Sequence, residues 1–166
     1  MNTKTRALLN EQIARELESG LLYLDLAARL EGKGLKGYAH WFCVQAEEEK
    51  NHASKFFHYL LDEGQEVTLG DLRMPSHETP ELQDILLESL KHEEYVTELI
   101  NNIYDVADND GDYRTMRFLD WFITEQAEEE KNARDNLEAF AMAAGCSCGN
   151  ACSCSLMALD REMGER

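Results

Sequence analysis

The sequence predicts an all-α protein: a four-helix bundle with one long crossover connection and a short fifth helix at the C-terminus. Three observations support this fold class. Four long segments repeat apolar residues at helical spacing, and few glycines or prolines interrupt them. The connections between these segments are short, then long, then short. The chain has 166 residues, the length of a single domain.

The expected helices follow from this periodicity and from residues that start or stop a helix. Gly64 ends the second helix, because glycine readily takes the left-handed conformation found just beyond many helix ends. Thr79 and Pro80 start the third helix as N-cap and first helical residue, and Ser155 caps the fifth. In order, helices are expected at about 5–30, 38–63, 80–107, 113–144 and 156–163.

The connection lengths predict the topology. The first and third connections are short, so each pair of helices forms an antiparallel hairpin. The middle connection has about 15 residues and reaches roughly 50 Å when extended, whereas a helix of about 27 residues is roughly 40 Å long. It can therefore cross the whole bundle. We expect the bundle over residues 1–145, a cysteine-rich link over 146–154, and the last helix of the same domain over 155–166.

Charge limits the classes of partner. With 33 acidic and 16 basic residues, the formal net charge is −17. Nucleic acids and anionic membranes are polyanions, so we expect neither as a partner and expect cations instead. No apolar run is long enough to span a bilayer. The segment Met1–Arg6 leads directly into an acidic amphipathic pattern, unlike a signal peptide, so a cytoplasmic protein is expected.

Polar residues interrupt the apolar stripe of every expected long helix. Each stripe carries a glutamate near its middle, and the second and fourth helices add one polar residue three positions away. Ionised carboxylates buried together repel one another, so without a partner they stay protonated. Two divalent cations would instead balance the charge of four ionised carboxylates. The pattern therefore predicts a dinuclear metal centre. Its candidate ligands are Glu16, Glu49, His52, Glu93, Gln126 and Glu129.

The same residues repeat along the chain. Adding 77 to positions 16, 49 and 52 gives 93, 126 and 129, so the ligand set occurs once in each of two pseudo-equivalent hairpins. A rival internal match relates 46–51 to 127–132 at an offset of 81. That offset aligns identical letters but not the candidate ligands, so the offset of 77 is the one that favours a shared centre.

These residues stand in motifs that resemble those of bacterial non-haem ferritin. The motifs are Leu9-Asn10-Glu11-Gln12 with Glu16 and Leu21-Leu22-Tyr23, then Glu48-Glu49-Lys50-Asn51-His52, Lys91-His92-Glu93, and Glu125-Gln126-Ala127-Glu128-Glu129. The resemblance covers almost the whole chain, including the short last helix, and departs from the family at the cysteine-rich link. It identifies the predicted bundle as ferritin-like.

The resemblance implies roles for individual residues. Glu16 and His52 would bind one iron, Glu93 and Glu129 the other, with Glu49 bridging and Gln126 nearby. Tyr23 would lie beside this ferroxidase centre and supply an electron or a hydrogen bond. The resemblance also implies a third iron site, formed by Glu48, Glu125 and Glu128.

An activity and an assembly are implied in the same way. The protein would oxidise Fe(II) to Fe(III) with O₂ or H₂O₂ and store ferric mineral inside a 24-subunit shell. No haem is expected, because Lys50 follows Glu49 where the related bacterioferritins have their haem-ligating methionine. Gln126 leaves the second metal with a weaker, oxygen-only ligand set. This donor set suits iron, but manganese and zinc as well.

The cysteines leave alternatives open. Cys146, Cys148, Cys152 and Cys154 could bind a soft metal or an iron–sulfur cluster, form reversible disulfides, or belong to a flexible link. Two competing functions follow: a rubrerythrin-like di-iron peroxidase that uses these thiols for electron transfer, and a non-catalytic scaffold that buffers metal. Cys43, alone on the second helix, is expected to be buried as a small apolar residue.

Overall fold

The computed structural model describes residues 1–74, 81–145 and 151–165, with side chains of the last segment from residue 154 onward. Every helix predicted from periodicity is present, and the all-α fold class is confirmed. The helices are α1 (Thr3–Gly32), α2 (Lys36–Asp62), α3 (Leu82–Asn109), α4 (Tyr113–Ala144) and α5 (Ala151–Met163).

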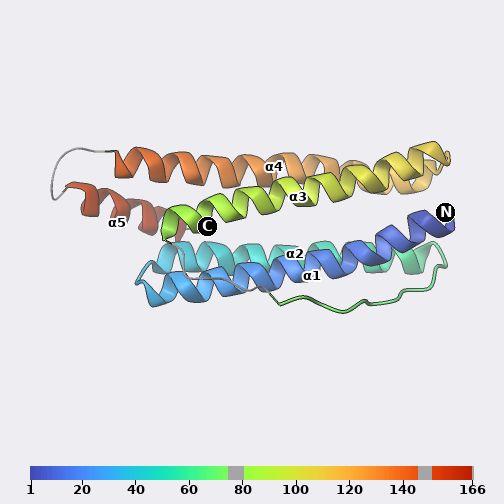
Figure 1. Ribbon diagram of the computed structural model, residues 1–166, viewed down its shortest axis with the longest axis horizontal. Coiled ribbons are helices and arrows are strands. Elements are labelled where there is room, and N and C mark those ends of the chain that lie inside the picture. The colour runs from blue at the N-terminus through green and yellow to red at the C-terminus, as the bar shows by residue number, and fades with distance from the viewer. Residues whose placement is uncertain (75–80, 146–150, 166) are drawn as a thin grey trace.

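The helices form two hairpins that lie one on the other. Figure 1 shows α1 beside α2 in one layer and α3 beside α4 in the other, with α5 at the end where α4 finishes. The chain that follows α2 runs back along α1, as the predicted crossover requires. Two side chains of α1 hold it there. Asn10 Oδ1 accepts from the Thr68 N–H at 2.6 Å, and Glu18 Oε1 accepts from the Arg73 N–H at 2.7 Å.

Local sequence explains where helices stop and where the next begin. Gly64 and Gly111, which follow α2 and α3, both have a φ of 65°, a conformation that side chains other than glycine rarely adopt. Asp112 then caps α4, because its Oδ1 accepts from the Thr115 N–H at 3.2 Å. These turns produce the tight hairpins.

Two helix starts differ from the prediction. Helix α3 has Glu81 as its N-cap, and Asp84 Oδ2 accepts from the Glu81 N–H at 3.1 Å, so this pair caps the helix two residues later than Thr79 would. Thr79 and Pro80 lie outside the described residues. Helix α5 begins at Ala151 rather than Leu156. The small Cys and Ser residues before Leu156 carry no apolar stripe, so periodicity gave no signal for a helix there.

The apolar core has two parts, separated along the bundle by a polar layer. On α1 one part ends at Ile13 and the other begins at Leu22, which leaves Glu16 between them. On α2 one part ends at Ala46 and the other begins at Ala53. Fully buried members are Tyr23, Leu26, Leu30, Tyr38 and Phe42 in one part, and Leu9, Phe56, Ile100, Leu119 and Phe122 in the other.

Helix α5 docks on the start of α2 through backbone contact at Gly37. A Cβ at Gly37 would lie 1.5 Å from the carbonyl oxygen of Asp160. The Asp160 side chain in turn accepts from the Tyr38 N–H at 3.0 Å. We expect Gly37→Ala to displace α5 and to cost about 1–3 kcal/mol, as overpacking does. Faster proteolysis or faster hydrogen exchange of α5 would show that the helix has been displaced. Gly32→Ala is the matched control, since its Cβ would meet nothing within 4 Å.

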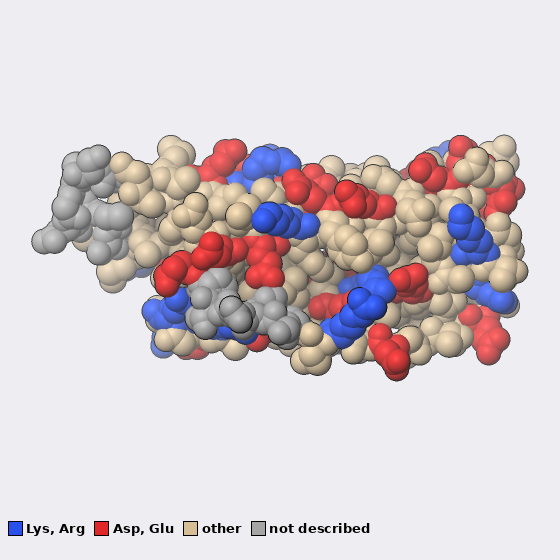
Figure 2. Space-filling model, viewed as in Figure 1, with Lys and Arg blue, Asp and Glu red and all other residues tan. Residues whose placement is uncertain are grey.

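Acidic side chains dominate the charge of the molecule. Figure 2 shows them over both layers, with lysine and arginine between them. Among the described residues, no helix is both long and apolar enough to cross a membrane. Four glutamates, however, are buried inside the bundle, in the polar layer.

Candidate metal centre

Helices α1 and α2 bring three predicted ligands together. Glu16, Glu49 and His52 each offer one ligand atom, and these atoms lie within 4.8 Å of one another. Glu49 and His52 are three residues apart, so they share a face of α2. His52 Nδ1 lies 3.4 Å from Glu49 Oε2 and 3.9 Å from Glu16 Oε2. All three residues are at most 2% exposed.

The atoms that meet at this point have no hydrogen-bond partner. Glu16 Oε2, Glu49 Oε2 and His52 Nδ1 are all buried and unpaired. Leaving a buried polar atom unpaired costs about 1–3 kcal/mol, and more for a charged group. Two carboxylate oxygens and an imidazole nitrogen that converge in a buried pocket are the donors that iron and similar metals prefer. The donor set therefore fits a cation.

Helices α3 and α4 supply the other half of the polar layer. Glu93, Gln126 and Glu129 are 2–4% exposed. Gln126 Nε2 donates to Glu93 Oε2 at 3.2 Å, and the Tyr23 hydroxyl donates to Glu93 Oε1. Both oxygens of Glu93 thus accept from neutral groups. The structure thus places Tyr23 beside the predicted ligands.

Three carboxylic acids of this layer have a raised pKa. Burial raises the pKa of Glu49 to about 8. Burial and the neighbouring Glu129 raise the pKa of Glu93 to about 8. The pKa of Glu16 rises well above its ordinary value because of burial and the charge of Glu49. A cation that binds here must displace protons, so binding is expected to strengthen as pH rises.

The other nitrogen of His52 contacts a residue of the predicted third site. His52 Nε2 lies 3.5 Å from Glu125 Oε1. A carboxylate beside Nε2 favours the tautomer that leaves Nδ1 free to bind a metal. Glu48 is partly buried and Glu128 is exposed, and in the described part of the chain the three acids do not converge as closely as Glu16, Glu49 and His52. The third iron site stays a prediction.

The fluorescence of Trp121 can be used to detect metal binding at this centre. Its ring packs edge-on against His52, with 5.5 Å between centroids, and Lys55 Nζ lies 4.0 Å above the same ring. We expect Co(II) bound at His52 to quench the fluorescence of Trp121, because transition-metal ions quench indole emission at short range. The Trp41→Phe variant isolates this signal, and adding His52→Ala to it should remove the quenching. Equal quenching with and without His52 would contradict the placement of the ion.

Two thiol predictions have different outcomes. Cys146, Cys148 and the side chain of Cys152 lie outside the described residues, and Cys154 is exposed. The metal, redox and link hypotheses for these cysteines stay predictions. The expectation that Cys43 is buried is wrong, since it is exposed. Successive helical residues are turned by roughly 100°, so with Phe42 inward Cys43 faces outward.

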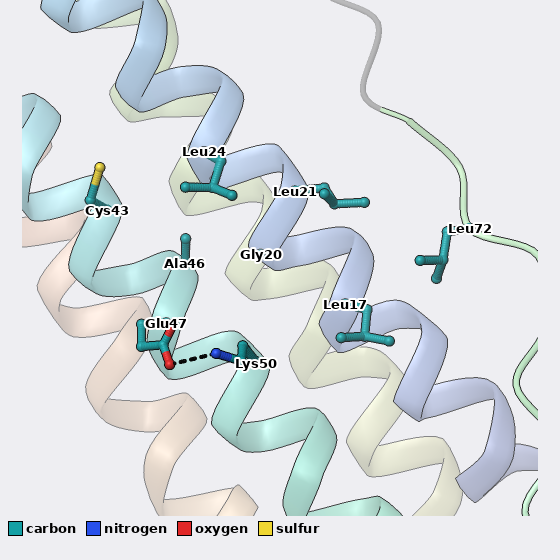
Figure 3. Close-up of a pocket in the computed structure, with 9 residues that line it drawn as sticks. All are labelled: Leu17, Gly20, Leu21, Leu24, Cys43, Ala46, Glu47, Lys50 and Leu72. Atoms are coloured by element: carbon teal, nitrogen blue, oxygen red, sulfur yellow. Dashed lines mark hydrogen bonds and ion pairs between the residues drawn. The ribbon is translucent and has the colours of Figure 1, made fainter.

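Cys43 lines a hollow on the outer side of α1 and α2. Figure 3 shows this hollow, into which leucines of α1 and Leu72 of the crossover point. Lys50, which stands where bacterioferritins have a methionine, forms an ion pair with Glu47 at 2.8 Å on its rim. The hollow is apolar and none of the six predicted ligands lines it.

Two buried amides contact the predicted ligands, and reasoning from sequence passed over both as functional residues. Gln12 and Gln45 are 2% and 1% exposed. A signal was present for each. Gln12 precedes Glu16 by one helical turn, and Gln45 lies on the inward stripe of the second helix, one turn before Glu49.

Known proteins are similar to this chain over the helices that form the polar layer. The family model described as "Ferritin-like domain" matches residues 6–143. The bacterial non-heme ferritin of Staphylococcus epidermidis RP62A is 33% identical over 132 residues, 80% of each chain. That of Escherichia coli O6:H1 is 34% identical over 135 residues, 81% of this chain and 82% of the other.

Solved structures are similar over the full length. The open pore ferritin of the archaeon Archaeoglobus fulgidus superposes with a TM-score of 0.93 at 32% identity, covering 100% of this chain and 99% of the other. A humanized archaeal ferritin gives the same TM-score and identity, covering 97% of its own chain. These similarities span all four helices that carry the candidate ligands.

Proposed function

The chain belongs to the ferritin-like domain family, and on this premise we propose that it stores iron and oxidises Fe(II) to Fe(III) as a ferroxidase. The observation that carries the proposal is the convergence of unpaired Glu16, Glu49 and His52 atoms inside the bundle. The fold itself is the ferritin fold. Iron is here the substrate, so the centre has to bind it and then release it.

Six residues would act on the iron. Glu16 and His52 bind one Fe(II), Glu93 and Glu129 bind a second, and Glu49 bridges the two. Gln126, which donates a hydrogen bond to Glu93, would be a neutral neighbour of the second ion, and the lack of a histidine at this position would leave that ion more weakly held. Two Fe(II) ions together supply the two electrons that convert O₂ and two protons into H₂O₂, and H₂O₂ in turn accepts two electrons.

Storage requires a shell of subunits around the product. We propose a shell of 24 subunits, in keeping with the similarity to archaeal ferritins over the whole chain. The net charge of −17 supports this proposal, because acidic walls attract Fe(II) and favour growth of ferric mineral. A cytoplasmic location and a third iron at Glu48, Glu125 and Glu128 belong to the same proposal.

Anaerobic addition of Fe(II) to metal-free protein, followed by O₂, tests this function. We expect a rapid phase of O₂ consumption that saturates near two Fe(II) per subunit, then growth of a mineral-filled particle seen by light scattering and electron microscopy. Zn(II) has no redox chemistry and accepts the same ligands, so protein preloaded with Zn(II) should lose the rapid phase. O₂ consumption no faster than in buffer alone would refute the proposed function.

A further inference from the structure

Two neutral amides in the polar layer each hold one candidate ligand. On α1, Gln12 Nε2 donates to Glu16 Oε1 at 2.9 Å. Between the hairpins, Gln45 Nε2 of α2 donates to Glu129 Oε2 of α4 at 2.8 Å. Each amide is nearly fully buried, and the two contact different carboxylates. The arrangement gives each iron position its own outer partner.

We propose that Gln12 and Gln45 are positioning residues that set the affinities of the two iron positions separately. Gln12 acts on the position at Glu16, and Gln45 on the position at Glu129. This inference rests on the proposed function, because it assigns the two carboxylates to different ions. Neither amide touches the iron itself.

Gln12 determines which oxygen of Glu16 faces the centre. Its N–H holds Oε1, while Oε2 is the unpaired atom 3.9 Å from His52 Nδ1. A carboxylate held by one oxygen binds metal through the other in a fixed direction, and outer partners of this kind orient metal ligands generally. Without Gln12, Glu16 would lose this constraint and rotate among several conformations.

Gln45 performs the equivalent task across the bundle. It reaches from α2 to Glu129 on α4, and so connects the two hairpins within the polar layer. Glu129 is a buried side chain of α4, and this hydrogen bond fixes the direction of one of its two oxygens. The hydrogen bond from Gln45 keeps this carboxylate within the centre, where Glu93 is its like-charged neighbour.

The chemistry of an amide suits this purpose. A lysine or arginine at either position would also donate to the carboxylate, but its charge would neutralise the ligand and compete with the cation. Glutamine orients the carboxylate without removing its negative charge. The two amides therefore add no positive charge that would compete with the divalent ions.

Calorimetric titration of metal-free protein with Co(II) under anaerobic conditions tests the inference. The unsubstituted protein should bind Co(II) in two interior steps, and His52→Ala identifies the step that belongs to the Glu16 position. Gln12→Leu should weaken that step by roughly 10- to 100-fold, the usual cost of losing an outer partner, and leave the other step unchanged. Gln45→Leu should do the reverse. Leucine conserves most of the volume of glutamine, so the packing around each site is preserved.

The outcomes separate positioning from general damage. If either variant leaves both binding constants unchanged, or if each weakens both steps equally together with a lower melting temperature, the positioning role is wrong. Co(II) absorption in the visible provides the second readout, since each variant should alter the spectrum of its own step alone. Absence of both steps from the unsubstituted protein would instead overturn the proposed function, and the positioning role with it.

Discussion

Glu49→Ala and His52→Ala are each expected to abolish the rapid phase of Fe(II) oxidation. Both residues contribute an unpaired atom to the same buried point, and Glu49 stands between the two proposed iron positions. Loss of a ligand should cost more than the roughly 10- to 100-fold that loss of an outer partner costs. Stopped-flow measurement of oxidation at two Fe(II) per subunit checks this, with circular dichroism to confirm folding.

Matched controls come from the same helix. Glu47 is exposed and paired with Lys50, and His58 is exposed near the end of α2. Glu47→Ala and His58→Ala change the same residue types outside the polar layer and should oxidise Fe(II) at the rate of the unsubstituted protein. If they reduced the rapid phase as much as Glu49→Ala and His52→Ala, the assignment of the site to the bundle interior would be wrong.

Metal-free protein is expected to lose stability as pH rises from about 4.5 to 8. Glu49 and Glu93 have pKa values near 8 in the folded chain because they are buried, against an ordinary value of 4.5. The unfolded chain therefore releases these protons at lower pH than the folded chain does. The protonated forms of Glu49 and Glu93 therefore contribute fully to the stability of the folded chain below pH 4.5. This contribution is lost as pH rises through 8, by an amount on the order of several kcal/mol.

Bound metal should reverse this dependence. A cation takes the place of the protons, so the stability gained from saturating Co(II) should be larger at pH 8 than at pH 5.5. Urea unfolding at both pH values, with and without Co(II), measures both effects. Glu49→Gln should flatten the curve of the metal-free protein, because it removes one of the buried acids. A metal-free protein that is equally stable at both pH values would contradict the burial of ionisable acids.

Heptad periodicity was sufficient to predict the polar layer. The stripes placed Glu16, Glu49, Glu93 and Glu129 inward, and all are at most 4% exposed. The reason is physical: a helix longer than 25 residues that is amphipathic along its length presents one face to the core throughout. The sequence also placed each acid near the middle of its stripe, and the structure shows Glu16 and Glu49 between the two apolar parts of the core.

Contacts that depend on the rotation of neighbouring helices could not be predicted in this way. The bond from Gln45 to Glu129 joins residues 84 apart, and no local spacing indicates which carboxylate a buried amide will meet. Cys43 illustrates the reverse error, since its residue type suggested burial while its angular position decided exposure. The early start of α5 was missed because small residues carry no periodic signal.

The most direct measurement is anomalous diffraction from crystals soaked in Fe(II) without oxygen. We predict two iron peaks within each subunit: one in contact with Glu16 and His52, the other with Glu93 and Glu129, and Glu49 touching both. Crystals that bind iron only on the outer surface, with these carboxyl groups still hydrogen-bonded to their protein partners, would contradict a metal centre inside the bundle.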